Sequence, residues 1–335
     1  MIDLVFVCDA TTATGFGHAA RCTSIAAAIR QRRSDLSIGF LGAFTERAVG
    51  FLGSRLPDAD ILPSDDPGPF GVAIVDRMAD PQDADAWDAG LLQRLREQCR
   101  HVVHIASGTT PPDMTEDMAE HVTVIGYQPI ADAPKRPNIY WDLKYAPVEI
   151  EAKPGLAVRP DVAFVAVGGG DSAQCLTLAL DTLAAINRFK TARVLVSPVW
   201  SDDAVAAAAA DYPGIKIERL ENLPDLSAKI GESAVVIATQ GNLAYQAIAL
   251  GRPTVLLAIK AFQADIARRL QAATLCRFAG LAAGLAPADL ARTIEAALAG
   301  AEAMTKTAAA SLDGQGIERL ADLVLRRYER ALARS

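Results

Sequence analysis

The sequence predicts an α/β protein made of two Rossmann-like, doubly wound domains in tandem. Three observations lead to this fold class. Apolar runs of strand length alternate with longer segments of helical periodicity, which is typical of parallel sheets covered by helices on both faces. The alternation stops at a proline-rich segment near the middle of the chain and then starts again. The chain also has 335 residues, whereas a single hydrophobic core stops growing at roughly 250 to 300 residues.

The first half of the chain contains strands and helices in alternation. Each expected strand is a short apolar run, and each expected helix repeats its apolar residues with a period of about 3.6. Strands are predicted at 4–8, 36–42, 71–76, 101–106 and 122–126, and helices over 18–32, 45–56 and 86–99. This order predicts one parallel sheet in an N-terminal domain over 1–150.

Residues 129–160 differ from the segments on either side of them. They show no clear period, as expected of a linker between domains. They also contain six prolines, at Pro129, Pro134, Pro137, Pro147, Pro154 and Pro160. We therefore place the domain boundary near 150–158.

The second half repeats the alternation in a predicted C-terminal domain over 151–310. Strands are predicted at 161–166, 192–198, 215–220, 234–239 and 253–259, and helices over 173–188, 202–211, from 242 and over 263–272. The last segment, 311–335, opens with the turn Asp313-Gly314. One helical stripe then carries Ile317, Leu320, Leu323, Val324 and Tyr328. We expect this helix to cross back and pack on the first domain.

Composition and charge restrict the function classes. The net charge is -7 without any block of Lys or Arg, which argues against nucleic acid or an anionic membrane and favours a small-molecule partner. Five scattered cysteines without a CxxC pair predict neither a disulfide nor a zinc site. The first apolar run lacks a basic leader and is too short to span a membrane. We expect a cytoplasmic protein, with its oligomeric state open and a monomer included.

The first candidate site is the stretch TATGFGHAARC, residues 12–22, which follows the first predicted strand. Open α/β sheets bind ligands at this place, outside the carboxyl end of a strand and at a helix N-terminus. Gly15 and Gly17 allow a phosphate or sugar to approach the backbone closely, and His18 can accept a proton near neutral pH. Arg21 follows one helical turn later. The alternative is that His18 merely caps the helix.

Two polar turns in the second half are further candidates. Gly169, Gly170, Asp171 and Ser172 follow a strand and precede a helix, as a phosphate-binding turn or a plain tight turn does. The turn with Gly241 and Asn242 also follows a strand and can present free amides to a diphosphate.

Weaker signals lie elsewhere in the first half. Asp76 and Arg77 end a strand, where the carboxylate faces a cleft or forms an ion pair. His101, His104 and His121 lack the spacing of metal ligands and are interpreted as structural or surface groups. The chain has no GxSxG elbow, no HExxH and no Walker A sequence, which excludes serine hydrolases, zinc proteases and P-loop NTPases of those families. The GxG turn also lacks the acidic ribose-binding partner of dehydrogenases.

An ordered set of motifs carries a resemblance to a known family. The motifs are GFGHAARC, AIVDR, YWDLKYAPV, VGGGDS, LENLPDLSAKIGESAVVIATQGN, ALGRPTVLLAI with Gln263, and LDGQG. Together they resemble the nucleotide-sugar hydrolases of pseudaminic acid biosynthesis and the related spore-coat polysaccharide proteins. That family is a branch of the GT-B glycosyltransferase superfamily related to the lipid II GlcNAc transferase. The resemblance runs through most of the chain.

The resemblance implies a UDP-sugar bound in a cleft between two domains, with the nucleotide held mainly by the second. In that scheme His18 orients or deprotonates the water that attacks the anomeric carbon, and UDP leaves. No metal or other cofactor is implied, because helix N-terminal amides can stabilise the departing diphosphate. The resemblance implies that backbone groups around Leu223 read the uracil and that the turns Gly169–Ser172 and Gly241–Leu243 hold the diphosphate. The other implied substrate contacts are Gly15, Gly17, Arg21, Asp76, Gln246 and Gln263.

The sequence departs from the family at three positions. Met78 stands where the family has tyrosine, Gln246 where it has a ribose-binding glutamate, and Phe262 where it has asparagine. A glutamine can still form hydrogen bonds to a ribose, but the identity of the sugar is left open. The leading hypothesis is hydrolysis of a UDP-linked 2,4-diacetamido-2,4,6-trideoxy sugar for nonulosonic acid synthesis, used on flagellin or surface glycans. A GT-B glycosyltransferase and a non-catalytic nucleotide-sugar-binding homologue are the alternatives.

Overall fold

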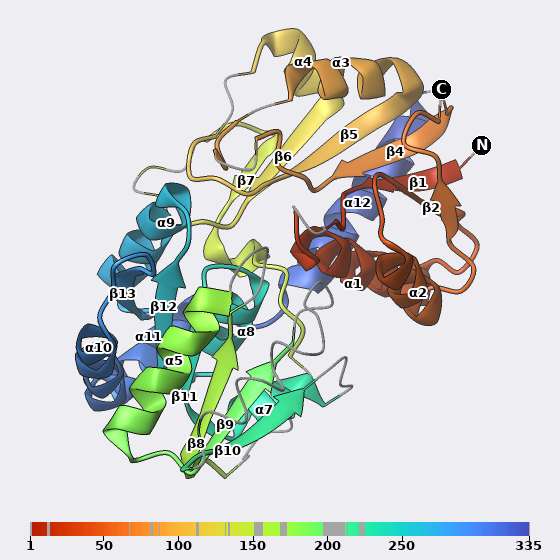
Figure 1. Ribbon diagram of the computed structural model, residues 1–335. Coiled ribbons are helices and arrows are strands. Elements are labelled where there is room, and N and C mark those ends of the chain that lie inside the picture. Colours follow the sequence, from red (N-terminus) through yellow and green to blue (C-terminus); the bar gives the residue numbers. More distant parts are fainter. Residues whose placement is uncertain are drawn as a thin grey trace. The chain divides into compact units, whose positions relative to one another are not determined.

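The computed structural model divides the chain into two compact units (Figure 1). Unit 1 comprises Met1–Pro147 and Gln315–Ser335, and unit 2 comprises Val148–Gly314. The structure describes residues 2–11, 14–66, 68–80, 83–86, 88–111, 114–130, 132, 135–150, 157–167, 173–196, 212, 214–220 and 225–334.

Unit 1 is built on a seven-stranded parallel sheet with the order β3-β2-β1-β4-β5-β6-β7. Its strands are β1 (Ile2–Val7), β2 (Ile38–Leu41), β3 (Asp60–Leu62), β4 (Phe70–Val75), β5 (Cys99–Ala106), β6 (Val122–Gly126) and β7 (Ile139–Trp141). The five predicted strands are confirmed, and β3 and β7 are additions. The chain moves outward from β1 through β2 to β3 and then returns to β4 beside β1, so the sheet has its topological switch point between β1 and β4.

The helices of unit 1 begin within a few residues of their predicted positions, apart from the short helix at Glu116–His121, which is an addition. They are α1 (Gly17–Arg32), α2 (Glu46–Arg55), α3 (Ala89–Gln98), α4 (Glu116–His121) and the C-terminal α12 (Gly316–Ala333). Thr45, Asp88 and Thr115 cap the N-termini of α2, α3 and α4 with side-chain oxygens, which satisfies backbone N–H groups that have no partner within the helix.

The C-terminal helix α12 packs on α1, β4 and β5 of unit 1. The five residues of its predicted apolar stripe are all buried. Tyr328 donates a hydrogen bond from its hydroxyl to Asp3 Oδ1 at 2.5 Å. Gly71 allows this approach, since a Cβ there would lie 3.1 Å from the Tyr328 ring and 2.3 Å from the carbonyl oxygen of Asp3. The helix thus joins the end of the chain to its first strand.

The segment predicted as a linker departs from that prediction in its first half. Within 129–160, β7 adds a strand to the sheet edge beside β6, and a single 3-10 turn follows at Leu143–Tyr145. Trp141 fills the edge of the core, and its indole N–H donates to the carbonyl of Gln128 at 2.8 Å. A three-residue strand surrounded by prolines has too few residues to show a period of two, so periodicity alone does not reveal it.

Unit 2 has a six-stranded parallel sheet with the order β10-β9-β8-β11-β12-β13. The strands are β8 (Arg159–Ala166), β9 (Thr191–Leu195), β10 (Lys216–Leu220), β11 (Ser233–Thr239), β12 (Thr254–Ala258) and β13 (Arg277–Leu281). The five predicted strands are confirmed and β13 is an addition. Its switch point lies between β8 and β11, so both units share one topology around their sheet centres.

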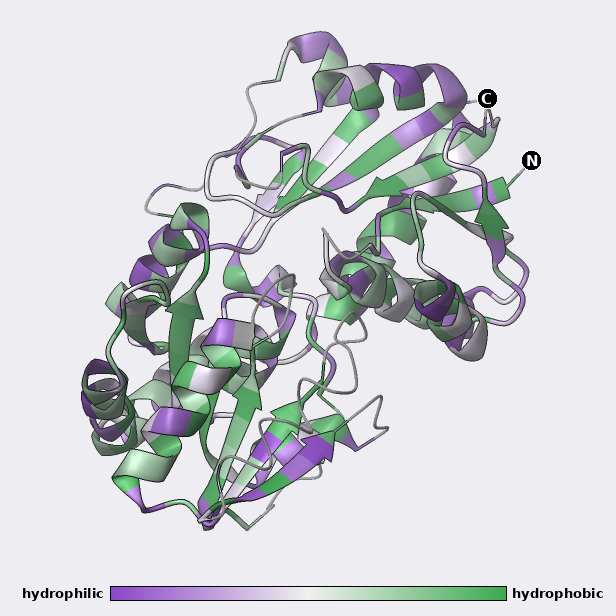
Figure 2. Cartoon of the chain, in the orientation of Figure 1, coloured by the Kyte–Doolittle hydropathy of each residue, from purple (hydrophilic) through white to green (hydrophobic). Residues whose placement is uncertain are grey.

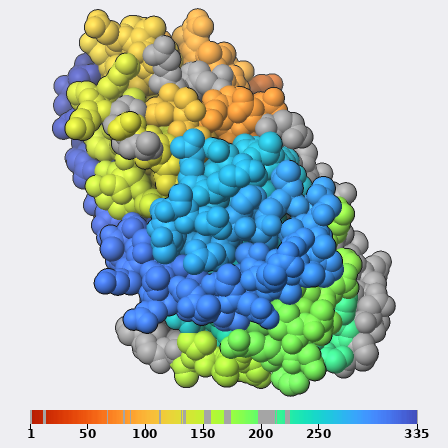
Figure 3. Space-filling view, turned by 90° about the vertical axis from the view of Figure 1, so that its left-hand side faces the viewer, coloured from red at the N-terminus to blue at the C-terminus, as the bar shows by residue number. Residues whose placement is uncertain are grey.

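The helices of unit 2 flank this sheet, and Figure 3 shows the face covered by the later ones, in blue. They are α5 (Ala173–Ile186), α7 (Leu226–Gly231), α8 (Asn242–Ala249), α9 (Ala261–Ala272), α10 (Pro287–Ala299) and α11 (Ala301–Ser311). The helix predicted over 202–211 lies outside the described residues.

The core of each unit lies between its sheet and its helices. The strands of both sheets are predominantly apolar, as Figure 2 shows in green, which is typical of parallel strands buried on both faces. Arg193 on β9 is an exception and is satisfied internally. Its guanidinium contacts Glu218 Oε2 at 3.2 Å and Glu232 Oε2 at 2.9 Å, and donates to the carbonyl of Lys229 at 2.9 Å. A buried cation needs such partners to offset its desolvation.

Two further observations concern the described residues. None of the helices there combines the length and the apolar composition that a membrane span requires. All five cysteines are buried as free thiols.

Candidate functional site

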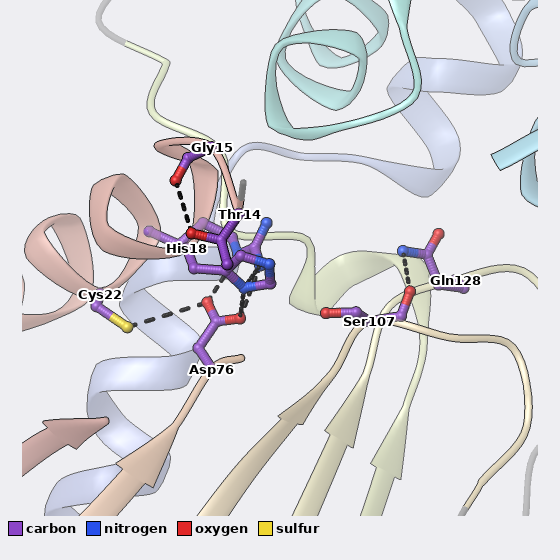
Figure 4. A network of polar contacts seen from close by, with 8 residues as sticks. Thr14, Gly15, His18, Cys22, Asp76, Ser107 and Gln128 are labelled. Carbon is purple, nitrogen blue, oxygen red and sulfur yellow. Dashed lines mark hydrogen bonds and ion pairs between the residues drawn. The ribbon is translucent and has the colours of Figure 1, made fainter. Parts of the chain in front are cut away.

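The strongest cluster of polar side chains lies at the switch point of unit 1, at the carboxyl edge of the sheet (Figure 4). His18 is in the first turn of α1, which follows β1, and Asp76 comes directly after β4. β1 and β4 are neighbours in the sheet with Val7 paired to Val75. Two residues that are 58 positions apart in sequence therefore meet at the place where open α/β sheets bind ligands.

The turn before α1 explains how His18 is placed. Gly15 has a φ of 73°, a conformation that favours glycine, and its N–H donates to the carbonyl of Thr11 at 2.9 Å. The N-cap position is held by Phe16 without a side-chain cap. The side chain of His18 contacts Asp76 and Arg21 rather than the first backbone amides of its own helix. This geometry differs from that of a capping histidine.

Arg21 and Asp76 form a buried two-point ion pair. Arg21 Nε donates to Asp76 Oδ2 at 2.8 Å, and Arg21 Nη2 donates to Oδ1 at 2.7 Å. The Asp76 side chain is fully buried and that of Arg21 is 7% exposed. Burial raises the pKa of Asp76, but the charges and hydrogen bonds of Arg21 and His18 outweigh burial and hold that pKa well below its ordinary value. Asp76 is thus a carboxylate throughout the physiological pH range.

His18 completes a triangle of close contacts with this pair. Its Nδ1 lies 2.8 Å from Asp76 Oδ1 and 2.8 Å from Arg21 Nη2. Seen from Nη2, Nδ1 and Oδ1 are about 60° apart, whereas the two N–H bonds of a planar guanidinium nitrogen diverge by roughly 120°. One Nη2–H already points to the carboxylate, so Nδ1 of His18 is best satisfied by donating its own proton to Asp76 Oδ1. The neutral ring then carries its lone pair on Nε2.

The Nε2 edge of the His18 ring lies away from the ion pair, because Nδ1 makes both contacts with it. The side chain is 12% exposed, and among the described residues the polar contacts of the ring all use Nδ1. A carboxylate on one ring nitrogen and access to the other is the arrangement of a general base oriented by an acidic partner. The site can therefore accept a proton from a water or a hydroxyl placed against Nε2.

Three titratable side chains next to this triangle are uncharged at neutral pH. Burial raises the pKa of Tyr127, which follows β6, and the charges of Arg21 and Asp76 act on it in opposite directions. Burial also lowers the pKa of His104 on β5 to about 4, so that this ring is neutral at pH 7. The Cys22 thiol lies 4.0 Å from Asp76 Oδ2, and burial raises its pKa well above the ordinary value. These three groups surround the ion pair in uncharged form.

Ser107 and Gln128 belong to the same edge and were not predicted. Ser107 follows β5, and its carbonyl accepts a hydrogen bond from Gln128 Nε2 at 3.2 Å. Its hydroxyl oxygen is buried and, within the described part of the chain, has no hydrogen-bond partner. In Figure 4 both residues lie on the β5 and β6 side of the cluster around His18. Their positions directly after predicted strands were the signal available in the sequence.

At the corresponding edge of unit 2, the described residues after β11 form a helix N-terminus. Gly241 follows β11 and is the N-cap of α8, whose first residues are Asn242 and Leu243. Gly241 has an extended φ that any residue adopts, and a Cβ built there meets nothing within 4 Å. Neither the backbone conformation nor the packing of the described residues demands glycine at this position. A ligand that approaches the backbone closely would demand it.

Gln246 lies one turn further along α8 and is buried. Its Nε2 donates to the carbonyl of Glu149 at 2.6 Å and to Ser227 Oγ at 2.9 Å, while Ser227 Oγ donates to the same carbonyl at 3.1 Å. The amide nitrogen expected to face a ribose is thus used to hold the segment that enters unit 2.

The remaining predicted residues have local roles or lie outside the described part of the chain. Gln263 caps α9, because its Oε1 accepts from the backbone N–H groups of Ile259 and Lys260 at 2.8 and 3.1 Å. Arg77 contacts Asp9 at 3.2 Å, whereas the ion pair considered for the Asp76 carboxylate is formed with Arg21. Outside the described residues lie Gly169, Gly170, Asp171, Ser172 and Leu223.

The other histidines take up separate positions in unit 1. Burial lowers the pKa of His101 to about 3, and this ring is hydrogen-bonded to Thr123 Oγ1 at 2.9 Å. His121 is half-buried at the end of α4, where its Nδ1 lies 3.3 Å from the carbonyl oxygen of Asp117. Over the described ranges, no group of three or more His, Cys, Asp or Glu side chains is arranged to hold a metal ion.

Solved structures with the same fold include glycosyltransferases and epimerases of nucleotide sugars. The chain is similar to MurG of Acinetobacter baumannii, with 13% identity and a TM-score of 0.65 over 97% of this chain and 99% of that chain. It is similar to a putative UDP-N-acetylglucosamine 2-epimerase from Listeria monocytogenes, with 12% identity and a TM-score of 0.57 over 98% of each chain. The spinosyn rhamnosyltransferase SpnG, in complex with spinosyn aglycone, has 15% identity and a TM-score of 0.59 over 94% and 98%.

These likenesses establish the fold alone. Two parallel-sheet α/β units in one chain match the GT-B fold of these glycosyltransferases and epimerases. No family model matches the sequence, and no curated protein matches it.

Proposed function

We propose that the protein hydrolyses a UDP-linked 2,4-diacetamido-2,4,6-trideoxyhexose at its anomeric carbon, releasing UDP and the free sugar. The reaction would serve synthesis of a nonulosonic acid, such as pseudaminic acid, for flagellin or surface glycans. The ordered motifs from GFGHAARC to LDGQG support the hydrolase assignment. The GT-B fold supports a nucleotide-sugar substrate.

One observation carries the proposal, namely the hydrogen bond from His18 Nδ1 to Asp76 Oδ1 at 2.8 Å. Because Nδ1 donates its proton to Asp76, Nε2 is the ring nitrogen that acts as the base. In the proposed step a water transfers a proton to Nε2 while its oxygen forms a bond to the anomeric carbon. The bond from that carbon to the diphosphate oxygen breaks, and UDP leaves with the electron pair. The imidazolium that forms is stabilised by the Asp76 carboxylate.

The second part of the proposal concerns the diphosphate. We assign it to the N-terminus of α8, where Gly241 leaves open space beside backbone N–H groups and the helix dipole favours an anion. Two solved structures with this fold contain ligands of that kind. A UDP-GlcNAc 2-epimerase from Neisseria meningitidis is bound to UDP-GlcNAc, and SpnG is complexed with thymidine diphosphate. Those ligands belong to the class that we propose for this chain.

Glycosyl transfer is the second candidate. The likeness to the rhamnosyltransferase SpnG favours it, because a base at Nε2 of His18 can deprotonate an acceptor hydroxyl as well as a water. The two reactions differ in the nucleophile and not in the leaving group.

A panel of UDP-sugars incubated in ¹⁸O-labelled water without acceptor tests the proposal. Mass spectrometry should find one ¹⁸O atom in the released sugar and none in UDP, because the proposed step cuts the bond between carbon and oxygen. Label in UDP would instead show attack at phosphorus and would contradict the mechanism. UDP release only on addition of an acceptor would identify a transferase. Calorimetric binding of UDP-sugars with no product under any condition would identify a non-catalytic homologue.

A further inference from the structure

We propose that Arg21 is a positioning residue for His18: its guanidinium holds Asp76 ionised and in one orientation, so that His18 keeps its proton on Nδ1 and presents an unprotonated Nε2 to water. The resemblance implies contact between Arg21 and substrate, whereas the geometry assigns Arg21 to Asp76. The catalytic part of this inference rests on the proposed function. The part that concerns the ring of His18 does not.

The two-point pairing fixes the orientation of the carboxylate. Arg21 Nε and Nη2 reach the two oxygens of Asp76 at 2.8 and 2.7 Å, which aligns the planes of the two groups and prevents rotation of the carboxylate. The oxygen that accepts from His18 is therefore held at one place. A lysine has a single ammonium and offers no such pairing.

The charge of Arg21 determines how strongly Asp76 attracts a proton to His18. An isolated carboxylate at 2.8 Å favours the protonated imidazolium. The guanidinium at the same distance from Nδ1 opposes that effect, because its positive charge repels an imidazolium. At the ring of His18 the charge of Arg21 therefore acts against the charge of Asp76.

The charged neighbour of Asp76 in the chain, Arg77, is itself paired with Asp9 at 3.2 Å. Burial lowers the pKa of Arg21, but the negative charge of Asp76 outweighs burial and raises it above the ordinary value, so Arg21 is always a cation. Titratable groups also face the cluster from the surrounding elements. Burial shifts the pKa of three of them so that they are uncharged at neutral pH. They are Cys22 on α1, Tyr127 after β6 and His104 on β5, with the Cys8 thiol after β1 behind them.

A structural role alone is a poor explanation of this pair. Well-packed apolar side chains commonly stabilise a core as much as a buried ion pair does, because both charges must be desolvated. The pair also lies against a histidine at the carboxyl edge of the sheet, and not at the middle of the sheet. A role in orienting His18 explains both why the pair is ionic and why it lies beside this histidine.

The first experiment needs no variant of Arg21. Selective ¹⁵N labelling of the four histidines and long-range NMR correlation of the ligand-free protein show which ring nitrogen carries the proton, with His18 assigned from a His18→Gln sample. We expect the neutral ring of His18 to carry its proton on Nδ1. A neutral ring with its proton on Nε2 overturns the proposal, whether or not the protein turns over any UDP-sugar.

The second experiment changes Arg21 and follows the same signals with pH. In Arg21→Met the acid limb of kcat/KM should move to higher pH, because no cation then opposes protonation of the ring. Arg21→Lys retains the positive charge, so the acid limb of its kcat/KM profile should stay closer to that of the wild-type protein. Its kcat should fall about tenfold with KM unchanged, because a geometric constraint is lost.

Arg30→Met on the same helix is the matched control, since Arg30 contacts only the carbonyl of Ser34 in the described chain. It should leave the NMR titration and the pH profile unchanged. Folding of each variant is checked by circular dichroism and by UDP affinity. A folded Arg21→Met protein in which His18 titrates as in wild type overturns the proposal. If that variant does not fold, Arg21→Lys decides, because unchanged kcat there refutes the orienting role.

Discussion

The two units share one sheet topology but differ in what their carboxyl edges offer. Each sheet reverses its strand order next to its first strand, between β1 and β4 in unit 1 and between β8 and β11 in unit 2. Unit 1 places charged and titratable side chains there, with His18, Arg21 and Asp76 joined by contacts of 2.7 to 2.8 Å. Unit 2 places Gly241 at a helix N-terminus with open space beside it. One fold thus carries a cluster of titratable side chains in one unit and a helix N-terminus with open space in the other, for which we propose proton transfer and anion binding.

The comparison shows that topology gives the location of a site and side chains give its chemistry. A histidine held by a carboxylate moves protons, whereas helix N-terminal amides hold negative charge without a change of protonation. The proposed hydrolysis needs both functions. Each of them can be disrupted separately by changing one edge at a time.

The largest effect is expected from His18→Gln in unit 1. Removal of a general base typically costs about 10²- to 10⁴-fold in kcat, and glutamine retains a hydrogen-bonding group toward Asp76. UDP affinity, measured by calorimetry, should stay close to wild type because we assign the nucleotide to unit 2. Full turnover in a folded His18→Gln protein would exclude His18 from the mechanism.

Asp76→Ala should affect stability as well as activity. It leaves the guanidinium of Arg21 buried and unpaired, which costs about 3 to 5 kcal/mol in the free energy of unfolding. Urea denaturation measures this loss. Asp35→Ala is the control, since its ion pair with Arg33 is exposed and its removal should change little. Equal stability of the two variants would show that the charge of Arg21 reaches water.

Acid should destabilise unit 1 before unit 2, because all four histidines lie in unit 1. His101 has a folded pKa of about 3, caused first by burial and then by nearby cations such as Arg327. Its unfolded value is higher, so the stability it contributes is complete above pH 6.5 and is lost as the pH falls toward 3. Between pH 7 and 5 the loss amounts to about 2 kcal/mol.

His101→Gln should remove this part of the pH dependence while retaining a hydrogen bond to Thr123. Urea midpoints at pH 7 and pH 5 measure the effect for wild type and variant. His121→Gln is the control because His121 lies on α4, none of whose residues is buried. An identical change of midpoint in all three proteins would show that His101 is already protonated in the folded state at pH 5.

Gly241→Ala should give the smallest effect and should be confined to unit 2. The position has room for a Cβ and an extended φ, so the free energy of unfolding should change by less than about 1 kcal/mol. If a diphosphate approaches this backbone, UDP affinity should fall about tenfold, or about 1.4 kcal/mol. Gly214→Ala, another position with open space, is the control. Unchanged UDP affinity in Gly241→Ala would place the nucleotide elsewhere.

The sequence predicted most long strands and helices but not the short edge strands. β4 is a continuous apolar run and β5 is a longer strand with an apolar centre, so their pattern and length identify them. β3 has three residues, of which two are exposed, and β7 lies among prolines. Such strands are stabilised by pairing with a neighbour rather than by their own composition, and single-sequence patterns do not contain that information.

The candidate site was predicted in parts and assembled by the fold. His18 was identified from its glycine turn, and Asp76 was considered as a strand-end carboxylate, but nothing local in the sequence joins them. Their contact depends on β1 and β4 being neighbours, which is a property of strand order. The hydrogen bond from Gln246 Nε2 to the carbonyl of Glu149 is likewise a tertiary contact. Periodicity and spacing give elements and candidate groups, and partners follow only from topology.

The packing of α12 on β4 and β5 also has a consequence for how the chain is made. Because Gln315–Ser335 belongs with Met1–Pro147, unit 2 is an insertion within unit 1 and not its successor. A ribosome releases the whole of unit 2 before it releases the helix that covers β4. Unit 2 can therefore complete its fold during synthesis, whereas unit 1 must wait for the last residues of the chain. The unit that carries His18 is therefore the unit whose residues are released completely only at the end of synthesis.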